Sequence, residues 1–568
     1  MPTLDWIGKQ AVVNHHRKVP YRLLHCDKAL SAGDPDTGNL LIQGDNLEAL
    51  QALRPYYAGK VKCIYIDPPY NTGNEGWIYN DNVNSPEIRR WLGEVVGKEA
   101  EDLTRHDKWL CMMYPRLALL RDFLTEDGVI YVSIDDNELP RLQLLMQEIF
   151  GSSNQVATLV WEKGKKGDSK LVSVTHEYVV VYAKNKSHLV SNGIRWRRRK
   201  PGVDEVLAHY ASLRTRFGVD HSAVRREMMA WYRALPASDP RKAHKHYNWS
   251  DDRGLYFAAD FAGPDDGRES RPRYDIYHPV TGRPCAKPST GWRWEEPRTL
   301  AALGETPPRI HFGPDETTIP CRKSYLAEVD QEPFQSVFYT DGRAATLQLE
   351  RLVGRNAFAF PKDHRVIGDL IALPDTANCL VLDSFAGSGT TGHAVLAQNK
   401  ADGGSRAFIL IEMDAAIARD VTSPRLRRVI EGDGAGAGLG GGFRFCTLGS
   451  AIFDDSGMVA EAVRFADLAA HLYFVETGTP LPNRANGKTP LFGVHQGRAF
   501  YLLYNGALGD KRPASGNVLT HAVAEALPPH PDGAGPRIVF GEACRLGDKA
   551  LASYGIIFRQ IPFDLKIG

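Results

Sequence analysis

Val61-Lys62-Cys63-Ile64-Tyr65-Ile66 runs directly into Asp67-Pro68-Pro69-Tyr70. The first six residues are apolar and β-branched enough to predict a buried strand, and the two prolines end its hydrogen-bond ladder. The sequence therefore puts a carboxylate, prolyl carbonyls and an aromatic ring at the carboxyl end of a strand, where open α/β sheets bind ligands. This set suits a planar ligand that carries an amine, such as adenine. A strand end with a tight turn and no ligand is the alternative, since short motifs also match by chance.

A second strand–loop–helix unit follows much later in the chain. Cys379–Phe385 predicts a buried strand and His393–Gln398 a helix, and Gly387, Gly389 and Gly392 form a GxGxxG pattern between them. Glycines at such a turn let backbone amides approach a ligand closely, and the helix N-terminus favours an anionic group. A tight turn without a ligand is again the alternative.

Glu412 ends the next predicted strand, Ala407–Ile411, twenty residues beyond the last glycine. An acidic residue at that place can accept hydrogen bonds from the two hydroxyls of a ribose. A nicotinamide dinucleotide and S-adenosyl-L-methionine both fit this pattern. Phe385 in place of a glycine and the Ser-Gly-Thr-Thr sequence favour S-adenosyl-L-methionine.

Helices alternate with strands on both sides of these two motifs, which predicts an α/β fold with a doubly wound, mostly parallel sheet. Although 315 residues separate Tyr70 from Phe385, we expect the two motifs to lie side by side at one sheet edge. A cofactor site beside an amine site is what a methyl transfer requires.

Asp45 and Asn46 follow the short apolar strand Asn39–Gln43 and precede a segment with helical spacing, Leu47–Leu53. Either residue can cap that helix or contact a ligand at the strand end, and the sequence leaves both interpretations open.

The bulk composition is that of a soluble globular protein of several domains: 568 residues, 43% hydrophobic, 24% charged, net charge +1. No apolar run is long enough to span a bilayer and the N-terminus does not resemble a signal peptide, so we expect a cytoplasmic protein without membrane contact. The eight cysteines are scattered without a CxxC pair or a metal-ligand cluster, which predicts reduced thiols and no metal site.

Basic and aromatic residues concentrate between positions 191 and 250, with 13 Lys/Arg against 5 Asp/Glu. Phosphate contacts and base stacking require this combination, although a solvated basic face would have the same composition. The predicted DNA-binding residues are Arg195, Trp196, Arg197, Arg198, Arg199 and Lys200.

Together the two motifs resemble the amino-methyltransferases of DNA, and their order, acceptor motif before cofactor motif, resembles the β class of adenine-N6 enzymes. The whole chain is similar to the modification subunit of a type III restriction-modification system. The resemblance implies a Rossmann-like methyltransferase sheet divided as follows: an N-terminal segment (1–38), a catalytic half (39–186), an inserted target-recognition domain (187–345), a cofactor half (346–445) and a small C-terminal α/β domain (446–568).

The resemblance also implies roles for individual residues. Asp67 and the carbonyl of Pro68 would accept hydrogen bonds from the adenine amine, and Tyr70 would stack on the flipped-out base. Lys362 would contact the cofactor's carboxylate, but Asp363 follows it where the family often has proline. The residues expected to form the acceptor motif are Asp67, Pro68, Pro69 and Tyr70, and those expected to bind S-adenosyl-L-methionine are Asp45, Asn46, Lys362, Asp383, Phe385, Ala386, Gly387, Ser388, Gly389, Thr390, Thr391 and Glu412.

The sequence thus predicts a site-specific adenine-N6 DNA methyltransferase. By resemblance it would act on double-stranded DNA as a homodimer, with a separate ATP-dependent restriction subunit as its partner. The alternatives are a solitary or type II-like methyltransferase, a cytosine-N4 methyltransferase, an NAD-dependent oxidoreductase that uses residues 379–412, and a catalytically idle DNA-binding subunit.

Overall fold

The computed structural model describes residues 3–72, 86–96, 104–164, 171–265, 271–374, 377–432, 434, 436–453, 458–460, 462–506, 512–533 and 535–561. The chain divides into two compact units, one made of residues 1–196 and 335–568 and the other of residues 197–334. The second unit lies inside the segment 187–345 that the sequence predicts as an insertion.

A ten-stranded sheet forms the centre of the first unit. Its strands, in spatial order, are β1 (Arg22–Gly33), β16 (Gly442–Ala451), β2 (Leu40–Gln43), β15 (Ala407–Glu412), β14 (Leu380–Asp383), β3 (Val61–Ile66), β4 (Leu124–Ile134), β6 (His176–Ala183), β5 (Gln155–Glu162) and β13 (Val337–Tyr339). Six of the nine strand pairs are parallel, whereas β1–β16, β4–β6 and β6–β5 are antiparallel. The α/β class is therefore confirmed, and the sheet is mixed.

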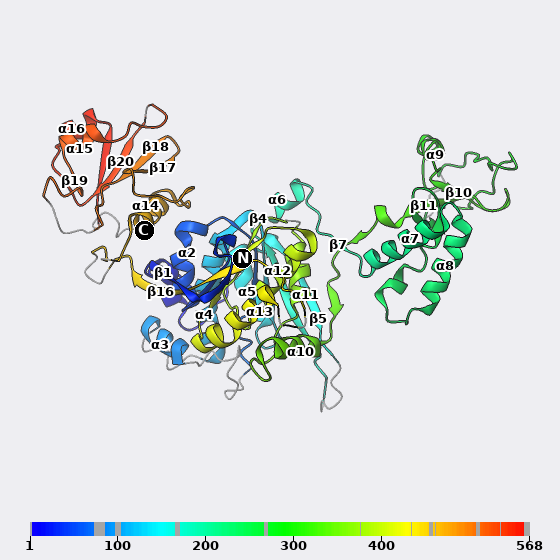
Figure 1. The fold of residues 1–568 in the computed structure, drawn as a ribbon, viewed down its shortest axis with the longest axis horizontal. Helices are drawn as coiled ribbons and strands as arrows, with labels where there is room; N and C mark the ends of the chain where they lie inside the picture. The colour runs from blue at the N-terminus through cyan, green and yellow to red at the C-terminus, as the bar shows by residue number, and fades with distance from the viewer. Residues whose placement is uncertain are drawn as a thin grey trace. The chain divides into compact units, whose positions relative to one another are not determined.

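Helices cover both faces of this sheet (Figure 1). Ile409 and Ile411 of β15 share a buried cluster with Leu50 of α2, whereas Leu410 faces the opposite side, near Gly392. One group of helices is α2 (Asn46–Tyr57), α4 (Arg105–Phe123) and α5 (Leu139–Phe150), and the other is α10 (Gly342–Val353), α11 (His364–Ala372), α12 (Thr390–Asp402) and α13 (Ser423–Glu431). Successive side chains of a strand point to opposite faces of the sheet, so the apolar residues of β15 pack against helices on both faces.

The inserted unit has its own fold and core. It contains a four-stranded antiparallel sheet in the order β10 (Ile310–His311), β11 (Cys321–Tyr325), β9 (Leu255–Ala259) and β8 (Trp249–Ser250), with a small pair of β7 (Arg198–Arg199) and β12 (Gln331–Glu332). Helices α7 (Val203–Phe217) and α8 (His221–Ala234) bury Val206, Val224 and Met228 against Leu255 and Leu326.

The C-terminal part of the first unit begins with α14 (Phe465–Thr477) and carries a second, four-stranded sheet. Its strands are β17 (Leu491–His495), β18 (Arg498–Leu502), β20 (Arg537–Gly541) and β22 (Ile556–Gln560), accompanied by α15 (His521–Ala526) and α16 (Asp548–Ser553). Strands β17 and β18 form an antiparallel hairpin. Gln496 and Gly497 turn it with φ values of 48° and 71°, as a two-residue hairpin turn requires.

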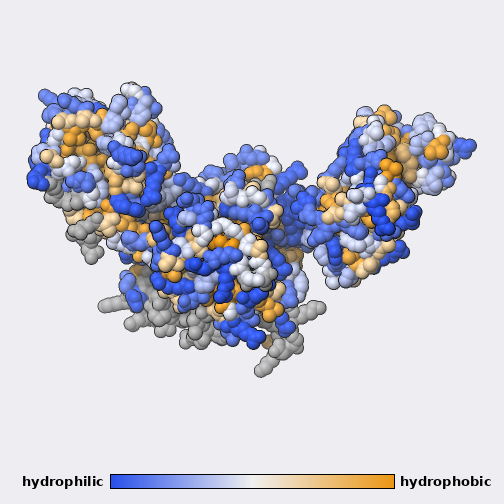
Figure 2. Space-filling view, in the orientation of Figure 1, coloured by the Kyte–Doolittle hydropathy of each residue, from blue (hydrophilic) through white to orange (hydrophobic). Residues whose placement is uncertain are grey.

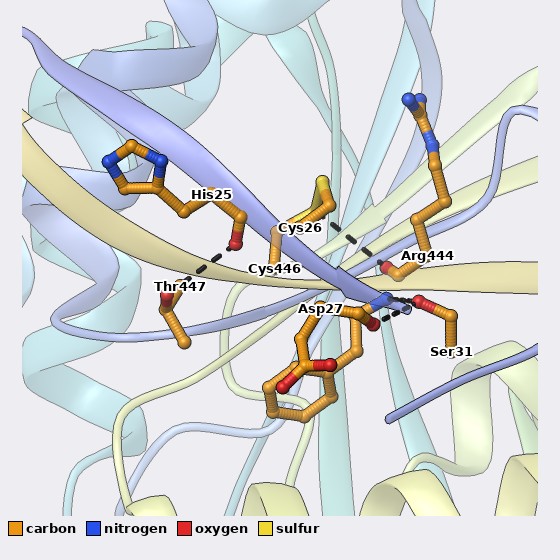
Figure 3. The surroundings of a disulfide bond; sticks show 8 residues. His25, Cys26, Asp27, Ser31, Arg444, Cys446 and Thr447 are labelled. Carbon is orange, nitrogen blue, oxygen red and sulfur yellow. Dashed lines mark hydrogen bonds between the residues drawn. A yellow bond between two sulfur atoms is a disulfide. The ribbon is translucent and has the colours of Figure 1, made fainter. Parts of the chain in front are cut away.

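The prediction that all cysteines are reduced is wrong for one pair. Cys26 of β1 and Cys446 of β16 stand directly opposite each other in the antiparallel ladder and are joined by a disulfide (Figure 3). The two residues are 420 positions apart, so only the pairing of the strands brings them together. Six cysteines are free.

On the face shown in Figure 2, hydrophobic surface is interspersed with hydrophilic surface and does not form one continuous patch. Within the described ranges, no helix combines the length and the apolarity that crossing a bilayer requires.

Candidate functional site

The acceptor motif and the glycine loop meet at one edge of the large sheet. β14 lies between β15 and β3 and is parallel to both, and Leu382 of β14 pairs with Ile64 of β3. From β14 the chain proceeds outward through α12 to β15, and from β3 it proceeds in the opposite direction through α4 to β4. Asp383 and Asp67 therefore end neighbouring strands at the point where the strand order reverses, which is where open α/β sheets bind ligands.

Asp67 is held by a lysine that the sequence assigns to the cofactor. Lys362 Nζ donates to Asp67 Oδ2 at 2.7 Å, and both residues are buried, with 8% of each exposed. Asp67 Oδ1 is buried and makes no hydrogen bond to any described residue. One oxygen of this carboxylate is thus fixed by a cation while the other is left to accept a further donor.

Helix α4 contributes a hydrogen bond that holds the backbone of the acceptor motif. Trp109 Nε1 donates to the carbonyl oxygen of Pro69 at 2.7 Å, while Pro68 is buried and Tyr70 is half-buried. Lys362 Nζ lies 4.9 Å from the centroid of the Tyr70 ring. Burial and the nearby charges of Asp67 and Glu177 raise the pKa of the Tyr70 hydroxyl well above its usual range. The ring therefore stays neutral at any physiological pH.

The glycine loop has the geometry that its residue types predict. Gly387 and Gly389 adopt φ values of 49° and 79°, in the left-handed region that favours glycine, and Gly389 precedes the first residue of α12. A Cβ on Gly392 would lie 2.8 Å from Leu426 and 2.9 Å from Leu410, so this glycine lets α12 pack closely on the sheet. Each glycine of the pattern therefore has a structural reason here.

A buried arginine that the sequence analysis missed organises this loop. Arg425 of α13, 1% exposed, donates to Ser388 O at 3.2 Å and to Ser388 Oγ and Thr390 Oγ1 at 2.9 Å each. Its other terminal nitrogen lies 3.3 Å from His393 Nδ1, and burial lowers the pKa of His393 to about 2. The hydroxyls of Ser388 and Thr390 thus have a protein partner. A charged residue among the apolar positions of α13 was the available signal.

Asp383, which is buried, and Glu412, which is half-buried, anchor the loop through their carboxyl groups. Thr391 Oγ1 and Phe385 N donate to Asp383 at 2.5 and 3.0 Å, and Gly387 N donates to Glu412 Oε2 at 2.7 Å. Burial raises the pKa of Asp383 to about 7, with the charges of Asp67 and Glu412 adding to the effect. Burial likewise raises the pKa of Glu412 to about 7. Both groups change charge near neutral pH.

Asp45 caps α2, the first of its two possible roles. Its Oδ1 accepts from Leu47 N at 2.9 Å and Glu48 N at 3.0 Å, and Arg116 Nη2 donates to its Oδ2 at 3.1 Å. Asn46 joins this cap to the segment after β14, since its Nδ2 donates to Ser384 O at 3.2 Å and its Oδ1 accepts from Arg116 Nε. Arg116 is fully buried and was missed in the sequence, where it reads as one surface residue of an amphipathic helix.

The departure from the family pattern after Lys362 has a local explanation. Asp363 is the N-cap of α11, where its side chain accepts from Arg365 N at 2.9 Å and pairs with the Arg365 guanidinium. Capping satisfies backbone donors at the helix start, so an aspartate is a good replacement for proline at this boundary.

The six predicted DNA-binding residues do not form one free basic strip. Arg198 donates to Glu332 at 2.9 and 3.1 Å, and Arg199 pairs with Asp204 at 2.5 Å and Asp330 at 2.9 Å. Lys200 Nζ lies 5.9 Å from the ring centroid of Tyr247, and the ring of Trp196 packs 6.5 Å from that of Tyr131. Arg195 and Arg197 are exposed.

Cavities of about 340 and 460 Å³ lie elsewhere in the first unit, beside β1, β16 and α14. Arg444 and Arg464 line both, and no residue of the acceptor motif or the glycine loop lines either. In the part of the chain that the structure describes, no group of three His, Cys, Asp or Glu side chains is arranged to hold a metal ion.

Comparison with known proteins agrees with this geometry. The model of a family described as DNA methylase (N6_N4_Mtase) matches residues 61–423. The chain is 35% identical over 438 residues to the type III restriction-modification enzyme EcoP15I Mod subunit of Escherichia coli, covering 72% of this chain and 64% of that protein. It is 33% identical over 460 residues to the EcoPI Mod subunit of Escherichia phage P1, covering 73% and 64%. It is 28% identical over 402 residues to the type II methyltransferase M.KpnI of Klebsiella pneumoniae, covering 69% and 84%. The chain thus spans less than two thirds of the length of the two type III relatives.

Proposed function

Because the chain belongs to the DNA methylase family, we propose that it moves a methyl group from S-adenosyl-L-methionine to the N6 amine of an adenine in double-stranded DNA. The single observation that carries this proposal is the Asp67 carboxylate beside the glycine loop. Its Oδ1 is buried and has no hydrogen-bond partner among the described residues, and its Oδ2 is held by Lys362. A buried acceptor without a donor is costly, so a ligand that brings an N–H there is favoured.

The loop residues fit the cofactor. Backbone N–H groups near the start of α12 suit a carboxylate, and the Glu412 oxygens, which each accept one backbone N–H, keep capacity for ribose hydroxyls. Ser384 Oγ is buried without a hydrogen-bond partner among the described residues, which leaves another polar atom for a ligand. Of the residues predicted for the cofactor, Asp45 and Asn46 support the loop through Arg116 and Ser384, and Lys362 belongs to the acceptor side.

The cofactor supplies an activated methyl group on a sulfonium, so the chain's own residues need mainly to align the amine. Asp67 Oδ1 accepts one N–H of the amine, and the carbonyl of Pro68 accepts the other. Both acceptors favour the positive charge that develops on nitrogen. Tyr70 stacks on a base rotated out of the duplex, since the amine cannot be reached inside the helix. Alignment of this kind accounts for a large part of catalysis in a direct displacement.

The type III relatives and the predicted domain order support a finer assignment. We infer that the large sheet is a Rossmann-like methyltransferase domain, that the inserted unit is the target-recognition domain, and that the protein is the modification subunit of a type III system. In that role it would form a homodimer in the cytoplasm, with an ATP-dependent nuclease as its separate restriction partner.

The test is to express the chain alone in cells that lack DNA methylation and to map modified bases across the genome by single-molecule sequencing. N6-methyladenine confined to one strand of a short asymmetric motif is the expected result. Methylation of both strands of a palindrome would support the type II-like alternative, and N4-methylcytosine alone would refute the choice of base. Absence of any modified base would refute the proposal.

Cofactor affinity is expected to depend on pH through Glu412. A ribose hydroxyl donates to the ionised carboxylate, so binding favours deprotonation of a group whose pKa is about 7 in the free protein. The dissociation constant should therefore rise as pH falls from 8 to 6, by up to about tenfold per pH unit below the pKa. Calorimetric titrations of wild type and Glu412→Gln over this range test it. The variant should bind more weakly and lose this component of the pH dependence, while titration of the ligand is common to both.

Arg195 and Arg198, two of the predicted DNA-binding residues, differ in whether an acidic residue compensates their charge. Arg195 is exposed and makes no ion pair within the described residues, whereas Glu332 compensates the charge of Arg198. Arg195→Ala is expected to weaken DNA binding and to reduce the slope of log K against log salt by about one. Arg198→Ala, the matched control, should leave the slope unchanged. Equal slopes for all three proteins would assign Arg195 to an ordinary solvated face.

A further inference from the structure

Four charged side chains of alternating sign form a row of contacts next to the acceptor motif: Asp67, Lys362, Glu177 and Lys163. Lys362 Nζ is 2.7 Å from Asp67 Oδ2 and 3.8 Å from Glu177 Oε2, and Lys163 Nζ is 2.5 Å from the same Glu177 oxygen. The four residues come from four segments: the end of β3, the loop before α11, strand β6 and the residue after β5. Glu177 and Lys163 have no role in the function proposed above.

The burial of Glu177 is unusual for its position. It belongs to β6, whose residues on the same face, Val179, Val181 and Ala183, are apolar and buried, and only 9% of its side chain is exposed. An ionised carboxylate at such a place is costly unless it is paired. Lys362 and Lys163 provide the pairing, and Glu177 Oε1 still lacks a hydrogen bond within the described chain. A Val-rich strand would be more stable with an apolar residue here, which points to a role other than folding.

Glu177 also contacts the aromatic ring of the acceptor motif. The Tyr70 hydroxyl donates to Glu177 Oε2 at 3.4 Å, while Lys362 Nζ lies over the Tyr70 ring. One carboxylate thus holds the outer end of the ring and the lysine that holds Asp67. Movement of Glu177 would displace both parts of the proposed amine site.

The four charges sum to zero, with two carboxylates and two ammonium groups. Removing the charge of Glu177 leaves two lysines beside Asp67 and a net charge of +1. A positive site opposes both the sulfonium of the cofactor and the positive charge that develops on the amine. Two lysines would also compete with the amine for the oxygens of Asp67.

We propose that Glu177 and Lys163 are positioning residues for methyl transfer, which keep the acceptor site electrically neutral and fix Lys362 and Tyr70 around Asp67. This inference rests on the proposed function. Neither the Asp67-Pro68-Pro69-Tyr70 motif nor the residue pattern of β6 indicates this role for Glu177.

The variant Glu177→Gln, which lacks one negative charge, is expected to have a pH dependence different from that of wild type. Lys163 faces Glu177, Lys362 and Asp67, and burial, opposed by the attraction of Glu177, lowers its pKa to about 8. Without Glu177 that pKa falls further, because the raising charge is lost and the like charge of Lys362 remains. Raising the pH then removes the proton of Lys163 and returns the site to neutrality, so the variant should regain activity as the pH increases.

The experiment measures single-turnover methylation, and cofactor affinity separately, for wild type, Glu177→Gln, Lys163→Met and the double variant. Glu177→Gln should lower the rate constant about tenfold at pH 6 and weaken cofactor binding relative to wild type at that pH, with recovery of both by pH 8. The double variant, again neutral, should recover most of the rate at pH 6. Glu177→Asp, which keeps the charge, should retain more activity than Glu177→Gln even if the glutamine variant is unstable.

Asp127→Asn is the matched control, because Asp127 pairs with Lys62 at the other end of β3. Its rate constant and pH profile should equal those of wild type. Additive losses in the double variant, or a Glu177→Gln profile parallel to wild type, would overturn the inference while leaving the proposed function intact. An inactive wild type would overturn both.

Discussion

Asp67→Ala is expected to abolish methylation, with a rate constant at least about a thousandfold below wild type. The variant removes the side-chain acceptor of the proposed amine site and, with it, the orientation of the nitrogen lone pair. Binding of S-adenosyl-L-methionine should remain measurable by calorimetry, because the loop at 385–391 and Glu412 are anchored by contacts that do not include Asp67.

The control for this prediction must account for Lys362. Removing Asp67 leaves Lys362 buried without the carboxylate at 2.7 Å, although Glu177 still lies 3.8 Å away, and breaking a buried pair costs about 3–5 kcal/mol in typical cases. Asp67→Asn keeps the volume and one acceptor oxygen, so its thermal unfolding should be closer to wild type. We expect it to be nearly as inactive, since its amide is neutral and its NH₂ group opposes an amine donor. Full activity in either folded variant would eliminate Asp67 as the acceptor.

Asp383→Asn is expected to stabilise the protein at neutral and alkaline pH while weakening cofactor binding about tenfold to hundredfold. Burial raises the pKa of Asp383 to about 7, so the folded state disfavours its charged form. An unfolded chain has the ordinary pKa of about 3.9, and each unit of difference corresponds to 1.36 kcal/mol. Ionised Asp383 therefore costs up to about 4 kcal/mol above pH 7, a cost that is absent below about pH 4.

The measurement is chemical unfolding of wild type and variant from pH 4 to pH 8. The stability of wild type relative to the variant should fall between pH 4 and pH 7 and then level off. Asparagine can still accept from Phe385 N, so the turn itself is retained. A constant difference across this range would contradict the raised pKa. Unchanged cofactor affinity would show that the carboxylate of Asp383 has no part in the cofactor site.

The two chemical motifs could be predicted because their local geometry follows from residue type. Two prolines end the strand after Ile66, and the left-handed φ values at Gly387 and Gly389 are those that glycine favours. The helices and strands next to them were also predictable, since buried strands and amphipathic helices have their own periods in the sequence.

Strands without a clear period were not predictable. β1 and β16 pair with each other across more than 400 residues, and their exposure pattern follows from that pairing rather than from an alternation in either segment. The disulfide between Cys26 and Cys446 belongs to the same contact, which is why the spacing of the cysteines gave no indication of it.

The sequence by itself determined which residues are candidates for the proposed chemistry and that strands bring them to a sheet edge, because short-range sterics and the hydrophobic period are local properties of the sequence. Only the tertiary structure decided which charges meet. It pairs Lys362 with Asp67 and neutralises Arg198 and Arg199 with acidic residues. It buries Arg116 next to Asp45 and Arg425 next to the glycine loop. It also brings Glu177 into contact with the hydroxyl of Tyr70. These contacts join segments that are distant in the chain, as for Lys362, Arg116, Arg425 and Glu177. An ionic contact has no period and no local conformation, so it cannot be predicted from the sequence.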